Sequence, residues 1–353
     1  KVEEIMKTKQ SKLTQIVFNY LKDMGSKEPK EIHNFLTKKH SSVYEDILEG
    51  KMSKVKDWFE NRDINIHPIQ TFREFNSETP IIICMATYPG RFNVIGKTVQ
   101  SLLDQTIIPT KIKIHVNQSN KSPPLPKDER IEVHLSPDLN ITDIGKFKLA
   151  AEEKTGIILT VDDDIHYPKD YVETMVSAVN RYSGNAIIGV HGCVLPVGEA
   201  VKDWKDYRQN RRVHWFRRSV SVDVPVNIVG TGTMAYDATK MKFNWQDYQE
   251  QRMVDIHVAV EAQENKWPMI SPIRPREWMV PIDPDEGDEA ESIWNMVQTD
   301  LTMQNDIINK LQSINEWNLF IPNQEPITKS DLDFLNNNFR EIKMMEKNNV
   351  KLP

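Results

Sequence analysis

The chain has 353 residues, which is enough for one large domain with additions or for two domains with a sizeable core. Its formal net charge of −6 at pH 7 disfavours a general binder of polyanions, so nucleic acid is not an expected partner. Two cysteines, Cys84 and Cys193, are too few for a disulfide framework or a zinc cluster. Both lie in apolar, strand-like segments, so we expect reduced, buried thiols in a reducing compartment.

Residues 1–78 are expected to form a helical N-terminal extension that carries no chemistry. Apolar residues recur there at helical spacing, as in Leu13, Ile16, Val17, Tyr20, Leu21 and Met24. Docking or scaffolding is the favoured role, and contact with an anionic membrane surface is the weaker alternative, because acids are interleaved with the lysines. No apolar run reaches the length of a membrane span, and the charged first residues are unlike a signal peptide. We therefore expect a cytoplasmic protein with at most peripheral association with the cell membrane.

From Thr79 onward, short apolar runs alternate with helical segments. Strands are predicted at 81–85, 111–116, 131–135, 157–161 and 186–190, and helices at 93–103 and after Pro168. This alternation is typical of an α/β domain with a largely parallel sheet, in which ligands bind at the carboxyl ends of the strands.

Polar side chains follow the first three predicted strands, at the edge where a ligand is expected. The ring of Tyr88 is suited to stacking on a base, and Arg91 and Lys146 are suited to pairing with phosphate. Asn117 and Asp143 are suited to hydrogen-bonding a base or ribose edge. Each alone is more often a surface residue, but their shared location favours a site.

The most informative stretch begins with the apolar run from Ile157 to Val161, which ends in three adjacent carboxylates, Asp162, Asp163 and Asp164. Two carboxylates about 4 Å apart repel by roughly 4 kcal/mol at an effective dielectric constant of about 20, and a bound cation relieves that repulsion. Carboxylates are hard oxygen ligands, so Mn²⁺ or Mg²⁺ is the expected ion, with an anionic substrate completing its coordination. A solvated acidic turn is the alternative. The buried strand before the acids and the helix after them favour the metal site.

Two later segments carry weaker signals. The basic and aromatic segment 204–218 is either an acceptor-binding loop, because aromatic faces suit sugar rings and arginines suit acidic ones, or a hairpin with one solvated face. Gly230, Thr231 and Gly232 are predicted to lie on an apolar strand, where bare backbone permits close approach of a ligand. They do not form a phosphate loop, because the lysine and the longer spacing are missing.

Asp255 is the most conspicuous polar residue of an apolar helical stretch. An ion pair with Arg252 is the ordinary explanation, and a catalytic or acceptor-orienting carboxylate is the more specific hypothesis. His257 is a candidate metal ligand, although a lone histidine is more often satisfied by a neighbour. Arg274 and Arg276 are expected in a proline-bounded loop that closes over a diphosphate. Residues 283–291 are predicted to form a mobile acidic loop, after which helix returns.

Several motifs occur together in this sequence. They are the acidic motif from Leu159 to Glu173, Ile188-Gly-Val-His-Gly-Cys193, Gly230-Thr-Gly-Thr233 and Arg252-Met-Val-Asp255, with Gly145-Lys-Phe147 and Trp294-Asn295. This combination resembles the bacterial capsular α-N-acetylglucosaminyltransferases of heparosan synthesis and the corresponding domain of bifunctional heparosan synthases. The resemblance implies a GT-A (Rossmann-like nucleotide-sugar-binding) fold at 79–295, with added helices at 1–78 and 296–353.

The resemblance also implies residue roles and a reaction. Asp162 and Asp163 would approach the ribose and the metal, Asp164 would be the principal metal ligand, and Asp255 would lie near the donor sugar and the acceptor hydroxyl. The implied reaction moves N-acetylglucosamine from UDP-GlcNAc to a terminal glucuronic acid with retention of the α configuration, and a glucuronosyltransferase subunit or domain is a possible partner. The full candidate set is Asp255 and Asp163 for catalysis, Asp164 and Asp162 for the metal, and Thr87, Tyr88, Arg91, Asn117, Asp143, Lys146, Asp162, Asp163, Gly230, Thr231, Gly232, Arg274 and Arg276 for the nucleotide sugar.

Two alternatives from different classes stay open. One is another GT-A transferase with a different donor or acceptor, such as a polypeptide or lipopolysaccharide sugar transferase, because donor choice depends on pocket shape. The other is a non-catalytic nucleotide-binding scaffold of a capsule complex, which would not need all the candidate acids and lysine together. A nucleotidyltransferase is disfavoured, because no glycine-rich loop with a basic residue is present to hold a triphosphate.

Overall fold

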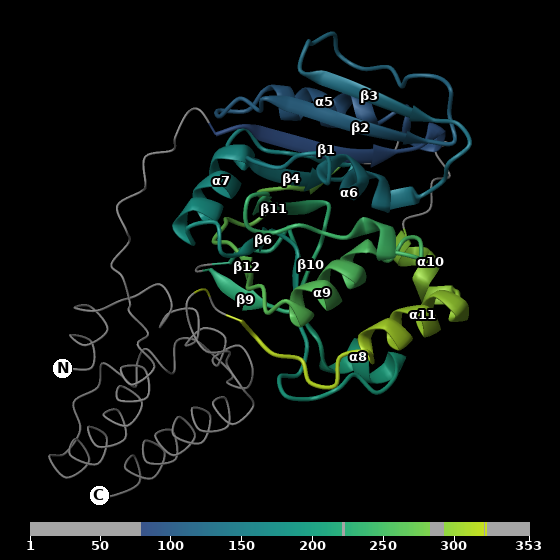
Figure 1. The fold of residues 1–353 in the computed structure, drawn as a ribbon, viewed down its shortest axis with the longest axis vertical. Helices are drawn as coiled ribbons and strands as arrows, with labels where there is room; N and C mark the ends of the chain where they lie inside the picture. The colour runs from purple at the N-terminus through teal and green to yellow at the C-terminus, as the bar shows by residue number, and fades with distance from the viewer. Residues whose placement is uncertain (1–78, 221–222, 283–292, 321, 323–353) are drawn as a thin grey trace, which may run out of the picture.

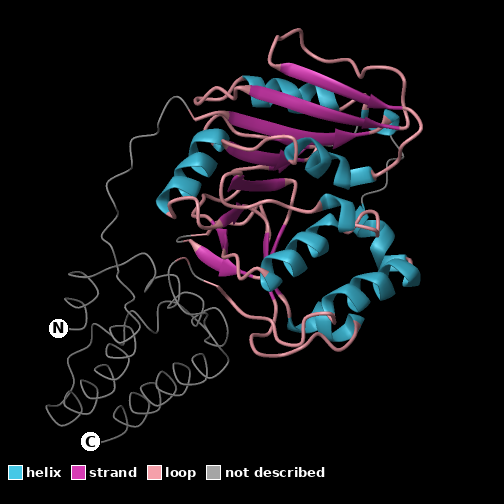
Figure 2. Cartoon of the chain, viewed as in Figure 1, coloured by secondary structure: helices cyan, strands magenta, loops and turns pink. Residues whose placement is uncertain are grey.

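A computed structural model describes residues 79–220, 223–282, 293–320 and 322. They form a mixed α/β structure around a large central sheet with helices on both faces (Figures 1 and 2). The expected N-terminal helices at 1–78, the acidic loop at 283–291 and the tail beyond 322 lie outside the described residues.

The first half of the sheet consists of parallel strands with the spatial order β3-β2-β1-β4. These strands are β1 (Ile81–Thr87), β2 (Lys111–Asn117), β3 (Ile131–Ser136) and β4 (Ile157–Val161). The first four of the five predicted strands are confirmed here, and three of them extend one or two residues further, into the polar positions at their carboxyl ends. Helices α5 (Ile95–Leu103), α6 (Gly145–Ala150) and α7 (Tyr171–Arg181) connect or follow them.

The second half of the sheet contains the two reversed strands. β11 (Thr233–Asp237) lies antiparallel between β4 and β6 (Ile187–Gly189), and β12 (Met269–Ser271) pairs parallel with β6. The edge strand β9 (Val224–Val226) is antiparallel to β12. Because β11 runs backwards, it starts at the edge where β4 ends, and the turn before it therefore lies beside the three acids.

Two smaller sheets lie beside the main one. β7 (Gly192–Val194) pairs with β10 (Ile228–Val229) and with β8 (Arg212–His214), and β5 (Ile165–His166) pairs with β13 (Val280–Pro281). The hairpin considered for 204–218 is wrong. That segment forms helix α8 (Trp204–Asn210) followed by β8, and β8 pairs antiparallel with β7, which precedes the segment.

Side chains of the central strands alternate between two apolar cores, one on each face of the sheet. Ile81, Ile83 and Met85 face α5 and α7, whereas Ile82 and Cys84 face α6. Cys84 and Cys193 are free and buried, as expected, and burial raises the pKa of the Cys193 thiol to about 12. Both thiols therefore remain protonated and unreactive at neutral pH.

Three helices pack together beside the second half of the sheet: α9 (Val254–Glu264), α10 (Ile293–Thr299) and α11 (Leu301–Leu311) (Figure 1). The expected domain boundary at 295 falls inside α10, and Leu311 belongs to the same core as α9. This part of the predicted C-terminal extension is therefore continuous with the α/β core. Within the described ranges, no helix has both the length and the apolar character needed to cross a membrane.

Candidate functional site

The three acids at the end of β4 point in different directions. Asp163 is buried, and its Oδ2 accepts a hydrogen bond from Thr87 Oγ1 at 2.6 Å, at the end of the neighbouring β1. The side chains of Asp162 and Asp164 are 45% and 31% exposed to solvent. Asp163 therefore ties the acidic turn to β1, while Asp162 and Asp164 remain accessible to a ligand.

Electrostatics make this turn a place where positive charge is favoured. Burial and the neighbouring Asp164 raise the pKa of the Asp163 carboxyl to about 7, although Thr87 and Arg91 oppose the shift. Burial and Asp162 raise the pKa of Asp164, against the effect of Arg91. Arg91 Nη2 lies 3.3 Å from Asp164 Oδ2 and compensates part of this charge.

Lys146 is the second cation at the turn and the more deeply buried one. Its side chain is 2% exposed, and its Nζ lies 2.7 Å from Asp162 Oδ1. Burial disfavours the charged ammonium, but Asp162, Asp143 and Asp255 together more than offset this and raise the pKa of Lys146. The sequence separates these three acids widely, and the fold gathers them around one lysine.

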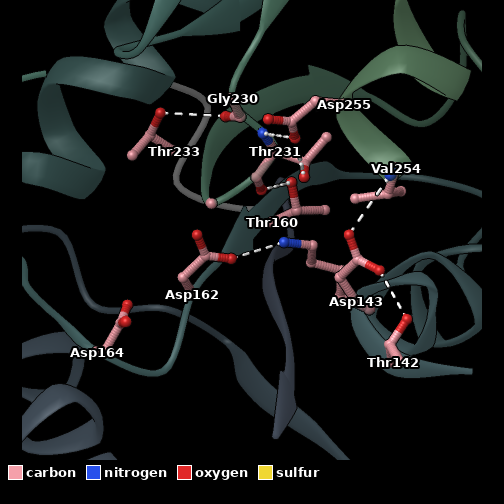
Figure 3. A network of polar contacts seen from close by, with 12 residues as sticks. Thr142, Asp143, Thr160, Asp162, Asp164, Gly230, Thr231, Thr233, Val254 and Asp255 are labelled. Carbon is pink, nitrogen blue, oxygen red and sulfur yellow. Dashed lines mark hydrogen bonds and ion pairs between the residues drawn. The ribbon is translucent and has the colours of Figure 1, made fainter. Parts of the chain in front are cut away.

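Asp255, at the start of α9, is held by the turn between β10 and β11 (Figure 3). Its Oδ1 accepts hydrogen bonds from Thr231 N at 2.8 Å and from Thr231 Oγ1 at 2.6 Å. The sequence offered an ion pair with Arg252 as the ordinary explanation for Asp255. In the structure, Asp255 contacts Thr231 instead. Burial raises the pKa of the Asp255 carboxyl, and the hydrogen bonds from Thr231 oppose the shift.

The predicted strand position of Gly230, Thr231 and Gly232 is wrong, because these residues form the turn between β10 and β11. A Cβ at Gly232 would collide with the carboxylate of Asp162, and one at Gly230 would lie 2.9 Å from Cβ of His191. The missing side chains thus allow close approach of other parts of the protein, and the expected approach of a ligand stays a prediction.

Two further candidates hold the loops of the site together. Asn117 Nδ2 donates to the carbonyls of Thr87 and Thr142, and its Oδ1 accepts from Ile141 N, which leaves little of the amide for a ribose contact. Asp143 Oδ1 accepts from Arg252 N at 3.0 Å.

Asp143 Oδ2 also accepts from Val254 N at 3.4 Å, at the first residue of α9 (Figure 3). It thereby satisfies one donor at the helix start that has no partner within the helix. Both Asn117 and Asp143 shape the site through the backbone, and their predicted contacts with a nucleotide stay predictions.

The two arginines predicted to close over a diphosphate differ in their surroundings. Arg274 is buried, and its guanidinium donates to Ser271 Oγ and to the carbonyls of Pro272, His214 and Trp215, so it braces the segment after β8. The side chain of Arg276 is 81% exposed, and its Nε lies 3.9 Å from Glu277 Oε1. Arg274 is therefore corrected to a structural residue, because both of its terminal guanidinium nitrogens already donate to oxygens of the protein, while its buried Nε has no hydrogen-bond partner among the described residues.

Tyr88 and His257 have contrasting surroundings. The Tyr88 ring is 39% exposed at the end of β1, a position from which it is available to stack. His257 is buried, with Nε2 3.1 Å from the Glu250 carboxylate, and its ring stacks on Tyr248. This favours the ordinary explanation for His257, a histidine paired with a neighbour through Nε2; its buried Nδ1 has no hydrogen-bond partner among the described residues.

Two residues that sequence reasoning did not select complete the network. Thr160, inside β4, donates from Oγ1 to the Thr231 carbonyl at 2.6 Å. The Tyr167 hydroxyl accepts from Asp162 N at 2.9 Å and donates to the Gly232 carbonyl at 2.6 Å. The sequence did contain a signal for Thr160, because it is the one polar residue of the otherwise apolar strand β4.

The accessible carboxylates fit a divalent ion that arrives with an anionic ligand. Within the described ranges, no three His, Cys, Asp or Glu side chains form a ready metal-binding group. Mg²⁺ in nucleotide sites commonly takes only one or two protein carboxylates and completes its shell with phosphate oxygens and water. Asp162 and Asp164 meet that requirement, and their mutual repulsion is what a cation would relieve.

Comparison with known proteins adds no family assignment, since no family model and no curated protein matches the chain. Any functional conclusion therefore depends on the residues and contacts described above.

Proposed function

We propose that this chain is a retaining glycosyltransferase of GT-A fold that moves N-acetylglucosamine from UDP-GlcNAc to an acceptor ending in glucuronic acid. One observation carries the proposal: Asp162 and Asp164 of the acidic turn, Lys146 of α6 and Asp255 of α9 lie together at the carboxyl end of the sheet. In open α/β sheets this edge is where ligands bind. The identity of donor and acceptor is inferred from the motif resemblance.

The reaction breaks the bond between the anomeric carbon and the diphosphate oxygen and forms a bond from that carbon to the acceptor hydroxyl oxygen. The acceptor proton passes to the departing diphosphate, on the same face of the sugar. Negative charge grows on the leaving group, so cationic groups held in place beforehand lower the barrier. Lys146 and Arg91 are such groups. Asp162 and Asp164 would hold a divalent ion, which when bound supplies further stabilisation of the diphosphate charge.

Asp255 is the residue best placed to act on the acceptor. Its carboxylate is anchored through one oxygen, is partly buried, and lies close enough to Lys146 and Asp162 for their charges to affect its pKa. We infer that it accepts a hydrogen bond from the acceptor hydroxyl and orients it toward the anomeric carbon. Asp255→Asn should slow transfer while UDP binding stays nearly intact, and loss of nucleotide affinity would argue against this role.

The decisive experiment mixes the purified protein with UDP-GlcNAc, Mn²⁺ and a glucuronate-ended oligosaccharide, and follows the acceptor mass. A gain of one N-acetylhexosamine supports the proposal. Parallel reactions with other UDP-sugars test the alternative of a different donor. UDP binding without transfer or hydrolysis of any UDP-sugar would favour the non-catalytic scaffold instead.

A further inference from the structure

Thr231 supplies both hydrogen bonds that the structure gives to the Asp255 carboxylate. Its backbone N and its Oγ1 both donate to Oδ1, at 2.8 and 2.6 Å. Thr231 is itself buried, so its hydroxyl is not exchanging freely with water. Two donors on one oxygen fix the rotation of the carboxylate and leave Oδ2 outside this contact.

Thr231 is in turn fixed by the strand that carries the acids. Its carbonyl accepts a hydrogen bond from Thr160 Oγ1 at 2.6 Å, and Thr160 is fully buried in β4 two residues before Asp162 (Figure 3). A continuous set of short contacts therefore joins β4, the turn before β11 and the start of α9. Thr231 therefore links Asp255 to the strand that leads into Asp162.

We propose that Thr231 is a positioning residue for Asp255, holding Oδ1 so that Oδ2 faces the acceptor hydroxyl. This role replaces the contact with the nucleotide sugar that the sequence suggested for Thr231. It rests on the proposed function, because the acceptor hydroxyl belongs to the transfer reaction. Thr231 touches no reacting atom in this role and acts only through Asp255.

The electrostatic surroundings of Asp255 predict that the positioning role of Thr231 affects the pH dependence of the reaction as well as stability. Among the described residues, the charged or titratable groups that interact electrostatically with Asp255 include Lys146 from α6, Asp162 from the acidic turn and Tyr207 from α8. A hydrogen bond from Thr231 favours the ionised carboxylate and opposes the rise in its pKa that burial causes. Loss of the hydroxyl should therefore move the acidic limb of the pH profile of kcat toward higher pH.

The test compares Thr231→Val, which removes the hydroxyl in a side chain of similar shape, with Thr231→Ser, which keeps it. For transfer of N-acetylglucosamine, Thr231→Val should lower kcat by about tenfold or more, the effect of one lost hydrogen bond to a charged group. The acidic limb of the pH profile of kcat should shift to higher pH in this variant. Its affinity for UDP with Mn²⁺, measured by calorimetry, should equal that of the unchanged protein. Thr231→Ser should restore kcat and the pH profile. If Thr231→Val does not fold, Thr231→Ala makes the same comparison without the added methyl group.

The outcomes separate the two proposals. An unchanged protein that transfers no sugar refutes the proposed function. An active protein in which the Val and Ser variants have equal kcat and equal pH profiles refutes the positioning role. A Val variant that loses UDP affinity shows that Thr231 contacts the nucleotide, and this also overturns the inference.

Discussion

At the scale of single residues, burial shifts the pKa of several titratable groups and ties the fold to their protonation. His115 in β2 is fully buried against Gly145, where a Cβ would collide with its ring. Burial and the nearby Lys148 lower the pKa of His115 to about 4. A neutral His115 is thus part of the packing that places α6, and with it Lys146.

His115 should make stability depend on pH. Its folded pKa of about 4 is below the ordinary value of 6.5, so the unfolded chain binds more protons between these values. The contribution of the buried, neutral imidazole to the free energy of unfolding is complete above pH 6.5. It is lost as pH falls toward 4, at up to roughly 1.4 kcal/mol per pH unit. Denaturant unfolding across that window measures this. His115→Leu should flatten the dependence, and an identical slope in the variant would contradict the assignment.

Lys146 offers a second test at this scale. Lys146→Met preserves the length of the side chain but leaves Asp162, Asp143 and Asp255 without their shared cation. We expect affinity for UDP with Mn²⁺ to fall at least about tenfold, or about 1.4 kcal/mol, in a calorimetric titration. Lys148→Met, two residues along the same helix, is the control and should bind normally. Equal affinity in both variants would remove Lys146 from the site.

At the scale of elements, the site is built where turns from distant parts of the chain meet. The reversal of β11 brings residues 230–232 beside the end of β4, and Asp143 joins the segment before α6 to the start of α9. The Tyr167 hydroxyl connects two of these turns. These contacts link backbone segments, so they tolerate little displacement.

Tyr167→Phe tests the connection between the turns. The change removes a buried hydroxyl and leaves Asp162 N and the Gly232 carbonyl without that partner, which should cost about 1–3 kcal/mol of unfolding free energy. Denaturant unfolding supplies the measurement. Tyr88→Phe, at an exposed ring, is the control and should change stability little. A Tyr167→Phe variant as stable as the control would show that water replaces the hydroxyl.

At the scale of the whole molecule, the two halves of the sheet supply different parts of the site. The parallel half provides Arg91, Lys146 and the acidic turn, whereas α9, beyond the second half, provides Asp255. A ligand held at the carboxyl edge would contact both halves and should stabilise the folded protein by mass action.

Ligand binding should therefore raise the thermal unfolding temperature. UDP and Mn²⁺ together should raise it more than the sum of each alone, with about 2.7 kcal/mol of stabilisation at a ligand concentration of 100 times Kd. Chelation of the metal should abolish the excess. The double substitution Asp162→Asn and Asp164→Asn should do the same, whereas Asp138→Asn, an exposed acid after β3, should not. A metal response that survives the double substitution would place the ion elsewhere.

The sequence by itself determined the central strands, the two inert cysteines and the acidic turn after β4, because apolar runs and abrupt polar endings are local patterns. Tertiary structure decided which polar residues meet: Thr231 with Asp255, Asp162 with Lys146, and Asp163 with Thr87. It also buried Arg274 among carbonyl oxygens and made residues 230–232 a turn. These outcomes depend on the reversed direction of β11 and on packing between distant segments, and neither leaves a periodic pattern in the chain.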